Sequence, residues 1–440
     1  MVSLGCPKNA VDTEFLLGDL LNEGYELTSN EKEADVVIVN TCGFIESAKQ
    51  ESVDAILEMA QLKSNGNCSQ LIVTGCLSER YSEELLKEIP EIDHMLGVGQ
   101  YPMLKEILRQ SGDRNLVNAP VEYFNGGANR ILTTPFYSAY LKIAEGCSNK
   151  CSFCIIPKMR GPFRSRPIDD LMVEARKLAD SGVKELNLVS QDTTMYGIDL
   201  RMKNGLIPLL EQLSTVEGIE WIRLFYCYPT FINNDLLDAI SALDKVCPYI
   251  DVPLQHTHDF MLKRMKRQER EAKVRVMLEE IRKRIPGVAL RTTFITGFPG
   301  EREEHFNHLR DFVREMEFDH VGLFTYSHEE GTTAFDLEHD VPHELALERN
   351  DELMSIQREI CLKKNAELVG QTIPILVEGV DKEEEFLVTG RTPTQAPDID
   401  GQVLIESSDV QVGEIVPMRI TGSTDYDLIA CAIESSPISA

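Results

Sequence analysis

The sequence predicts an α/β protein in three parts: an N-terminal parallel α/β sheet, a central partial (β/α)6 barrel and a small C-terminal β-barrel. Over the first two parts, near-continuous apolar runs alternate with amphipathic helical stretches, which is typical of parallel strands covered on both faces. Short apolar runs punctuated by Gly and Pro follow near the C-terminus and indicate a small barrel. A length of 440 residues fits two or three domains.

The N-terminal part contains three apolar strands that each end in a cysteine. These strands are predicted over 2–6, 36–42 and 71–76. Helical stretches follow near 10–22, 44–63 and 79–88. Because ligands of such sheets bind beyond the carboxyl ends of the strands, we expect Cys6, Cys42 and Cys76 to converge at one edge. The alternative is three independent buried cysteines, since free Cys is commonly buried.

The central part is predicted to begin after a turn-rich linker at 125–129 and to contain six strands with helices between them. The strands are predicted over 138–145, 185–191, 221–229, 249–255, 289–297 and 320–327. Such a series favours a partial (β/α) barrel with its site at the C-terminal rim. A charged helix over 343–368 closes this part. We expect domains over 1–125, 133–369 and 370–440.

A second group of cysteines lies just past the first strand of this predicted barrel. Cys147, Cys151 and Cys154 form a C-x3-C-x2-C run, and three thiolates can hold an iron–sulfur cluster, zinc or copper. In a cubane cluster three cysteines leave one iron open, as a catalytic zinc keeps one position free. A structural zinc knuckle is the alternative, but no fourth Cys or His follows at knuckle spacing. The run therefore predicts an open-iron cluster at the rim.

Charge and cysteine content limit the class of partner and the compartment. The net charge of −28 argues against broad nucleic-acid binding. The segment 371–440 has thirteen acidic residues against Lys382, Arg391 and Arg419, so it would repel phosphates and attract a basic protein. Eleven cysteines without an export signal or a membrane-length apolar stretch favour the cytoplasm.

The C-x3-C-x2-C run, with Phe153 before its last cysteine, resembles the radical S-adenosylmethionine (SAM) superfamily. In that superfamily the amino and carboxylate groups of SAM chelate the open iron, and an electron from the cluster splits SAM to give a 5′-deoxyadenosyl radical. Further segments resemble the methylthiotransferases over essentially the whole chain, including a C-terminal barrel like the TRAM module. These segments are 3–9, 40–45, 74–77, 139–147 and 291–300.

This resemblance implies two 4Fe–4S clusters as well as SAM. Cys6, Cys42 and Cys76 would hold an auxiliary cluster whose open iron carries the sulfur to be delivered. One SAM would methylate that sulfur, and a second would supply the radical that abstracts hydrogen from an unactivated carbon. The residues implied as SAM contacts, each of which could instead be an ordinary rim residue, are Phe153, Ser190, Gln191, Gln255 and Arg291. No catalytic side chain is assigned.

Members of this family act either on a modified adenosine of tRNA or on the β-carbon of an aspartate in small-subunit ribosomal protein S12. The acidic C-terminal part favours the protein substrate, because ribosomal proteins are basic. The runs 3–9, 191–194 and 253–256 also look like the aspartate enzyme. The small ribosomal subunit and a flavodoxin or ferredoxin as electron donor are therefore the expected partners. The alternatives are a tRNA-modifying enzyme and a non-catalytic metal protein that regulates ribosomes.

Two basic segments leave alternatives open. An acid-free group near the second cysteine run could stabilise the anionic cluster and SAM carboxylate, dock an acidic electron donor, or be a solvated loop. Its members are Lys150, Lys158, Arg160, Arg164 and Arg166. The segment 263–284 is predicted to be an amphipathic helix with a solvated basic face.

Overall fold

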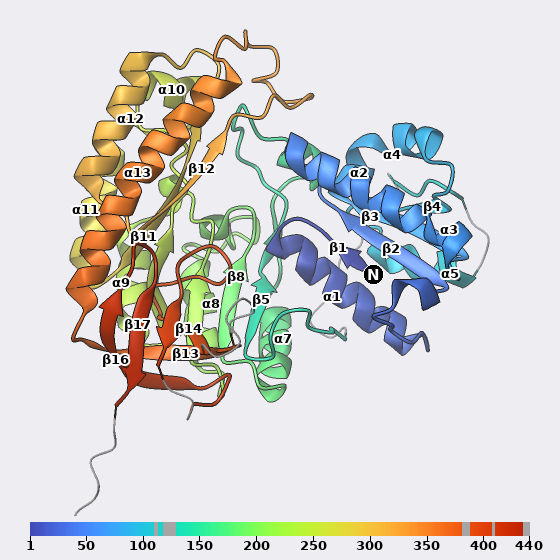
Figure 1. Cartoon of the computed structure of the whole chain (residues 1–440), viewed down its shortest axis with the longest axis horizontal. Coiled ribbons are helices and arrows are strands. Elements are labelled where there is room, and N and C mark those ends of the chain that lie inside the picture. Colours follow the sequence, from blue (N-terminus) through green and yellow to red (C-terminus); the bar gives the residue numbers. More distant parts are fainter. Residues whose placement is uncertain (110–112, 118–128, 381–387, 407–409, 434–440) are drawn as a thin grey trace, which may run out of the picture.

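The computed structural model describes residues 1–109, 113–117, 129–380, 388–406 and 410–433. It confirms the predicted α/β class in three parts (Figure 1). The N-terminal sheet lies beside the central barrel, and the C-terminal barrel lies against one end of it. Most of the predicted linker at 125–129 falls outside the described residues.

The N-terminal part is a four-stranded parallel sheet in the order β1-β2-β3-β4. Its strands are β1 (Val2–Ser3), β2 (Val36–Thr41), β3 (Gln70–Gly75) and β4 (His94–Met95). Its helices are α1 (Pro7–Asn22), α2 (Glu46–Ala60), α3 (Leu62–Asn65), α4 (Cys76–Glu88) and α5 (Leu104–Arg109). Strand β4 and helix α5 were not predicted. Strand β1 ends earlier than predicted, because Gly5 turns the chain at a φ of 89° and Pro7 starts α1.

The central part is a six-stranded parallel sheet that curves without closing, which confirms the predicted partial barrel. Its order is β12-β11-β10-β9-β8-β5. The strands are β5 (Ser138–Lys142), β8 (Glu185–Val189), β9 (Trp221–Leu224), β10 (Val246–Asp251), β11 (Ala289–Thr296) and β12 (His320–Thr325). A small antiparallel pair, β6 (Ala144–Glu145) with β7 (Arg164–Ser165), follows β5.

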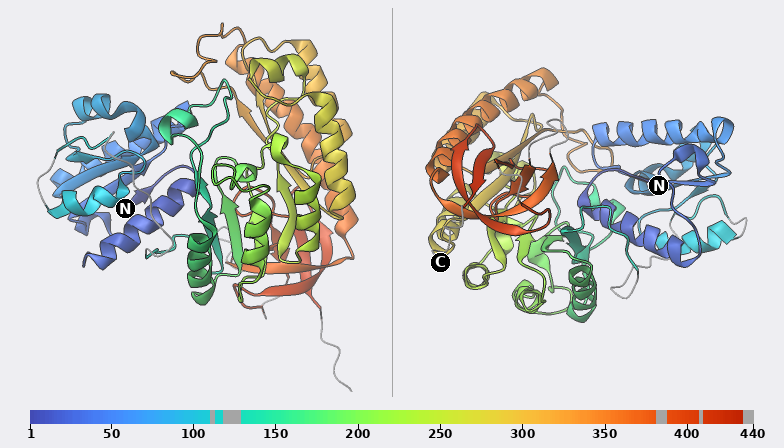
Figure 2. Two further views of the ribbon diagram at one scale, coloured as in Figure 1. Left: turned by 180° about the vertical axis from the view of Figure 1, so that it is seen from behind. Right: turned by 60° about the horizontal axis from the view of Figure 1, so that its bottom comes forward.

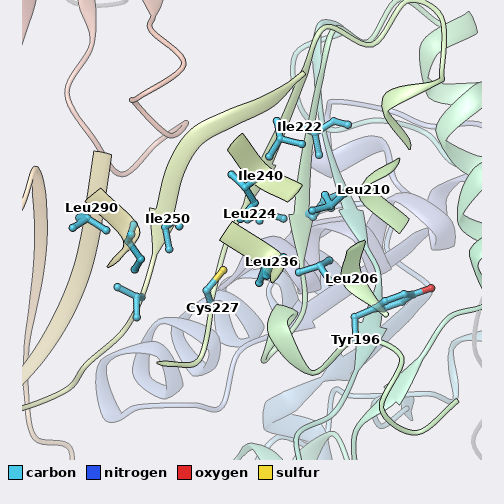
Figure 3. Close-up of a cluster of buried hydrophobic side chains, with 14 of the residues drawn as sticks. Tyr196, Leu206, Leu210, Ile222, Leu224, Cys227, Leu236, Ile240, Ile250 and Leu290 are labelled. Atoms are coloured by element: carbon cyan, nitrogen blue, oxygen red, sulfur yellow. The ribbon is translucent and has the colours of Figure 1, made fainter. Parts of the chain in front are cut away.

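Helices cover the outside of this sheet, as the view from behind in Figure 2 shows. They are α7 (Ile168–Asp180), α8 (Leu206–Ser214), α9 (Asn234–Ala242), α11 (Glu271–Arg284), α12 (Glu303–Met316) and α13 (His343–Leu368). The short α6 (Ile156–Met159) packs against α4, and α10 (Asp259–Arg264) packs at the end of β11. Aliphatic side chains of α8 and α9 pack on β9, β10 and β11 (Figure 3). Each such buried side chain stabilises the fold by about 1.5–3 kcal/mol.

The segment 263–284 is not one helix, so that prediction was wrong. Helix α10 ends at Arg264 and α11 begins at Glu271. Between them Lys266 has a left-handed backbone, with a φ of 55°, and Arg267 is buried. Within the described residues, none of the helices is both long enough and apolar enough to cross a membrane.

A separate apolar cluster fills the inside of the sheet and joins all three parts. Phe15 of α1 packs in it with Tyr140 of β5 and Tyr249 of β10, and Leu376 and Ala396 of the C-terminal part close it. The cluster is rich in aromatic rings, which bury large apolar areas. The relative placement of the three parts therefore rests on a shared core.

The C-terminal part is a closed five-stranded barrel, as predicted, although its last strand was not expected. Its strands are β13 (Thr372–Val380), β14 (Val388–Arg391), β15 (Val403–Ile405), β16 (Ile415–Ser423) and β17 (Leu428–Ala432). The predicted run over 386–389 lies partly outside the described residues.

Several acidic residues of this barrel face the central part rather than solvent. Asp398 accepts a hydrogen bond from the Tyr140 hydroxyl at 3.3 Å, and Asp400 accepts one from Tyr249 at 2.8 Å. Arg391 pairs with Glu185 at 2.7 Å. Composition alone therefore overstates how acidic the free surface of the barrel is, because part of that charge seals the end of the central sheet.

Candidate metal and cofactor site

The structure brings Cys6, Cys42 and Cys76 together at the carboxyl edge of the N-terminal sheet. Cys42 and Cys76 directly follow β2 and β3, and Cys6 caps the N-terminus of α1. A Cβ added to Gly5 would lie 3.0 Å from the Cys42 sulfur, so the backbone before Cys6 passes close to Cys42. The charge on Cys6 also acts on the pKa of both other thiols. The predicted convergence of these three residues is therefore observed.

The three thiols differ in how readily they ionise. Burial raises the pKa of Cys6, but Lys8, Arg160 and backbone N–H groups of α1 outweigh burial and leave it below its usual value. Burial raises the pKa of Cys42, and it raises that of Cys76 to about 12. A metal that binds all three thiolates must displace these protons, so loading is coupled to deprotonation.

Cys147, Cys151 and Cys154 lie in the loop after β6, at the carboxyl end of the central sheet. Gly146 has a φ of 77°, and a Cβ there would lie 2.6 Å from the carbonyl oxygen of Gly161. Only glycine fits such a close approach of two backbones. The Cys147 N–H donates to that same oxygen at 3.1 Å, which fixes the first cysteine of the loop.

Two further contacts hold the cysteine loop against the barrel. Asn149 donates from Nδ2 to the Asp192 carboxylate at 2.8 Å, which ties the loop to the segment after β8. Arg267 stacks 4.1 Å from the centre of the Tyr228 ring, and its Nη1 lies 3.8 Å from the sulfur of Cys151. Arg267 is thus a buried cation beside a thiol, whereas the sequence pattern placed it on a solvated helix face.

Neither cysteine group has the tight spacing that a single metal ion needs. Among the described residues, no three His, Cys, Asp or Glu side chains are placed to hold one ion. A tetrahedral zinc keeps its ligands about 2.3 Å from one centre, whereas a cubane cluster offers each cysteine its own iron. Three thiols gathered more loosely beside a buried arginine fit the larger anionic cluster.

A buried ionic network connects the two cysteine groups, with Arg160 at its centre. Arg160 donates from Nε to the Cys76 sulfur at 3.4 Å and from Nη1 to both oxygens of Glu145 at 3.0 Å. It also contacts Asp12 at 3.3 Å and the Asn9 amide oxygen at 2.9 Å.

Lys142 completes this network from the end of β5. It pairs with Asp12 and, at 2.8 Å, with Glu145, which lies two residues before Cys147. Burial raises the pKa of Glu145, but Arg160 and Lys142 overcome burial and hold that pKa well below its usual value. The network therefore places fixed charges between the two cysteine groups and shields them from water.

The members of the predicted basic group near the second cysteine run differ in burial. Arg160 is buried, and the Arg166 side chain is only 12% exposed and pairs with Asp170 and Glu174. The solvated-loop interpretation is wrong for these two arginines. Arg164 is half-buried, whereas Lys150 and Lys158 are exposed and therefore the most accessible of the group to an electron donor.

The predicted SAM contacts lie at different depths of the barrel. Ser190 is buried directly after β8, and Gln191 donates to Glu145 at 3.0 Å. The Oε1 of Gln191 is buried and accepts no hydrogen bond from the described residues, so it can receive a ligand donor such as an ammonium group. Phe153 packs edge-on to Phe298, at 6.5 Å between ring centres.

Gln255 and Arg291 are held by other parts of the barrel. The Gln255 backbone bridges to β11, and its φ of 70° places it in the left-handed region. Arg291 is directed to Asp251 at 3.0 Å and to Asp400 of the C-terminal barrel at 3.6 Å. Its guanidinium therefore joins the charge cluster that seals the lower end of the sheet, and its contact with SAM stays a prediction.

A loop after β12 reaches back to the first cysteine group. Glu329 pairs with Arg80 at 2.9 Å and with Lys49 at 3.2 Å, and Arg80 donates to the carbonyl oxygen of Gly43, next to Cys42, at 2.6 Å. Sequence patterns did not predict this contact, because its members lie far apart along the chain. Through Arg80 the loop is linked to the backbone next to Cys42.

Comparison with family models matches each part of the chain separately. Residues 1–97 match the uncharacterized protein family UPF0004, residues 141–313 match the radical SAM superfamily, and residues 369–433 match the TRAM domain. Among solved structures, the radical SAM methyltransferase TsrM from Kitasatospora setae aligns with a TM-score of 0.55 at 15% identity. The alignment covers 74% of this chain and 72% of TsrM, which supports the fold alone.

Curated relatives match over nearly the full length. A protein of Trichlorobacter lovleyi is 48% identical over 99% of this chain and 98% of its own. One of Pelobacter propionicus is 50% identical over 98% of this chain and 96% of its own. Both are named ribosomal protein uS12 methylthiotransferase RimO. At this identity and coverage the predicted family is confirmed, and the chain belongs to the RimO family of radical SAM methylthiotransferases.

Proposed function

We propose that this protein inserts a methylthio group at the β-carbon of an aspartate in ribosomal protein S12, using SAM and two 4Fe–4S clusters. The observation that carries the proposal is the pair of cysteine groups joined by one buried network through Arg160. Relatives of similar length that are named for this reaction on S12 support the substrate. The aspartate as the modified residue and the second cluster are parts of this proposal that the names of the relatives do not state.

Each cofactor has residues that fit it. Cys147, Cys151 and Cys154 would hold the cluster that binds SAM, with the free Oε1 of Gln191 nearby. The residues that would hold the auxiliary cluster are Cys6, Cys42 and Cys76. When bound, SAM and the clusters supply the radical and the sulfur.

The chain itself excludes water and fixes charge around these groups. Arg160 and Lys142 neutralise Asp12 and Glu145 in a buried position, so no water is needed to solvate the carboxylates. Arg267 sets a positive charge beside Cys151, and Arg160 sets one beside Cys76. Both guanidiniums remain charged at any working pH and favour an anionic cluster.

The partners follow from charge and compartment. The net charge of −28 favours a basic protein over tRNA, although some barrel acids face inward. Exposed Lys150 and Lys158 near the second cysteine group suit an acidic electron donor such as flavodoxin or ferredoxin. Eleven free cysteines suit the cytoplasm, where thiols stay reduced.

Substrate competition tests the proposal. The reconstituted, reduced protein is incubated with SAM, sulfide, small ribosomal subunits and tRNA together, and both products are analysed by mass spectrometry. We expect a methylthio group on one aspartate of S12 and unmodified tRNA. Modified tRNA with untouched S12 would assign the protein to the other branch of the family.

A further inference from the structure

Lys8 lies at the junction between the two main parts of the protein, two residues after Cys6. Although it is a lysine, it is only 7% exposed. Its Nζ lies 3.5 Å from the centre of the Tyr226 ring and 3.4 Å from the carbonyl oxygen of Ser190. Lys8 therefore reaches from the auxiliary cysteines to the rim of the barrel, where SAM is expected.

No carboxylate in the part of the chain that the structure describes is paired with Lys8. Among the described residues it forms no ion pair, and its single hydrogen bond to Ser190 is long. It also sits in the first turn of α1, which contains no acidic residue. Because the N-terminus of a helix is positive, this position disfavours a cation. Lys8 lowers the pKa of the Cys6 thiol but forms no ion pair with a carboxylate of the described residues. A buried ammonium without such a partner is costly, so the site can receive a further anion.

The other cations at this junction already have carboxylate partners. Lys142 and Arg160 share Asp12 and Glu145, and Arg267 pairs with Glu269 at 3.3 Å. An anionic group that enters between the cysteine groups therefore finds Lys8 as the cation without such a partner among these four.

The surface beneath Lys8 is preorganised. Tyr226 has a φ of 56°, which is unusual for a bulky residue, and its N–H donates to Asp251 at 3.0 Å. This backbone presents the ring face toward the Lys8 ammonium. Strained backbone of this kind gathers at binding and catalytic sites.

We propose that Lys8 binds the side-chain carboxylate of the acceptor aspartate. The inference rests on the proposed function and adds a specificity-determining residue to it. In aspartate the carboxylate is bonded directly to the β-carbon, so the cation that fixes the carboxylate also fixes the carbon that reacts. A position between Cys6 and the barrel rim is where that carbon must lie to meet both sulfur and radical.

Binding of S12 tests this role apart from turnover. Purified S12 and its acceptor Asp→Asn variant are titrated against reconstituted protein carrying Lys8, Lys8→Met or Lys8→Arg. Lys32→Met, at an exposed lysine of the same N-terminal part, is the control. Iron content and the cluster absorption spectrum are measured on each preparation.

We expect the unmodified protein to prefer the Asp form of S12. Lys8→Met should weaken binding of the Asp form on the order of tenfold to a hundredfold, as for loss of a hydrogen bond to a charged group, and should leave the Asn form unchanged. Lys8→Arg should keep the preference, and Lys32→Met should match the unmodified protein. Iron content should be the same throughout.

Three results would overturn the assignment. They are an unmodified protein without preference, a Lys8→Met variant that keeps the preference, and a Lys8→Met variant that loses iron. The last would make Lys8 a counter-ion of the auxiliary cluster. Failure of the unmodified protein to methylthiolate S12 would refute the proposed function instead, so the two failures are distinct.

Discussion

Arg160 donates a hydrogen bond from Nε to the sulfur of Cys76 at 3.4 Å, although 84 residues separate the two along the chain. The same guanidinium holds Glu145, two residues before Cys147, at 3.0 Å. One buried side chain thus touches the surroundings of both cysteine groups. Only a planar fork with several donors can reach a sulfur and two carboxylates at once.

Arg160→Lys tests this bridge. Lysine keeps the charge for Asp12 and Glu145 but lacks the fork, so the contact with Cys76 should be lost. We expect iron content after reconstitution to fall from about eight to about four atoms per chain, because one cubane is lost. Arg166→Lys is the matched control, since Arg166 is in the same segment, also pairs with two carboxylates and has no hydrogen bond to a cysteine among the residues that the structure describes. Equal iron loss in both variants would contradict a specific role of Arg160.

Gly146→Ala should disrupt the radical cluster site. At a φ of 77° a new Cβ would contact the carbonyl oxygens of Gly161 and Pro162, so the cysteine loop must move. Backbone strain costs about 1–2 kcal/mol and the clash about 1–3 kcal/mol more. Gly161→Ala is the control: Gly161 has a similar φ of 71°, but the nearest atom to a Cβ added there is 3.6 Å away. Cluster absorbance and urea unfolding should therefore change more at 146 than at 161, and equal effects would argue against the close backbone approach.

The seal between the C-terminal barrel and the central sheet should depend on pH. Burial raises the pKa of Glu185, but Arg391 and Arg223 overcome burial and hold it at about 2, below the ordinary 4.5. The stability from this group is therefore present above about pH 4.5 and is lost as pH falls toward 2. The shift corresponds to about 3 kcal/mol.

Urea unfolding of the Glu185→Gln variant checks this pH dependence. The variant should be less stable than the unmodified protein near pH 6, and the difference should shrink below pH 4.5. Glu378→Gln is the control, because burial raises the pKa of Glu378 even though it binds the same Arg391. A difference for Glu185→Gln that stays constant from pH 6 to pH 3 would contradict the ionised pair.

Local patterns sufficed to predict most of the strands and both cysteine groups, because apolar runs and cysteine spacing are visible in contiguous sequence. Strand β4 has two residues, too short for any periodicity, and strand β1 was predicted longer than its two residues. The partner of Arg160 at Asp12 lies 148 residues away, so burial of that arginine could not be read from its basic neighbours. Arg267 was likewise assigned to a solvated face, since the break between α10 and α11 depends on tertiary contacts with Tyr228 and Cys151.

The inward-facing acids of the C-terminal barrel show the same limit. Asp398 and Asp400 counted toward an acidic docking surface, but they bind tyrosines of the central sheet. Net charge is a property of composition, whereas surface charge depends on which charged side chains stay exposed after folding. The preference for a basic protein substrate therefore rests more on the relatives than on the barrel.

The division of labour between the two cysteine groups is the central claim, and Cys76→Ala tests it most directly. In one reaction with reduced protein, SAM, sulfide and small subunits, 5′-deoxyadenosine and methylthio-S12 are both quantified, with Cys154→Ala alongside. The Cys76→Ala variant should still form 5′-deoxyadenosine but yield no methylthio-S12, and Cys154→Ala should form neither. Methylthio-S12 from the Cys76→Ala variant would contradict the assignment of sulfur delivery to the N-terminal cysteines.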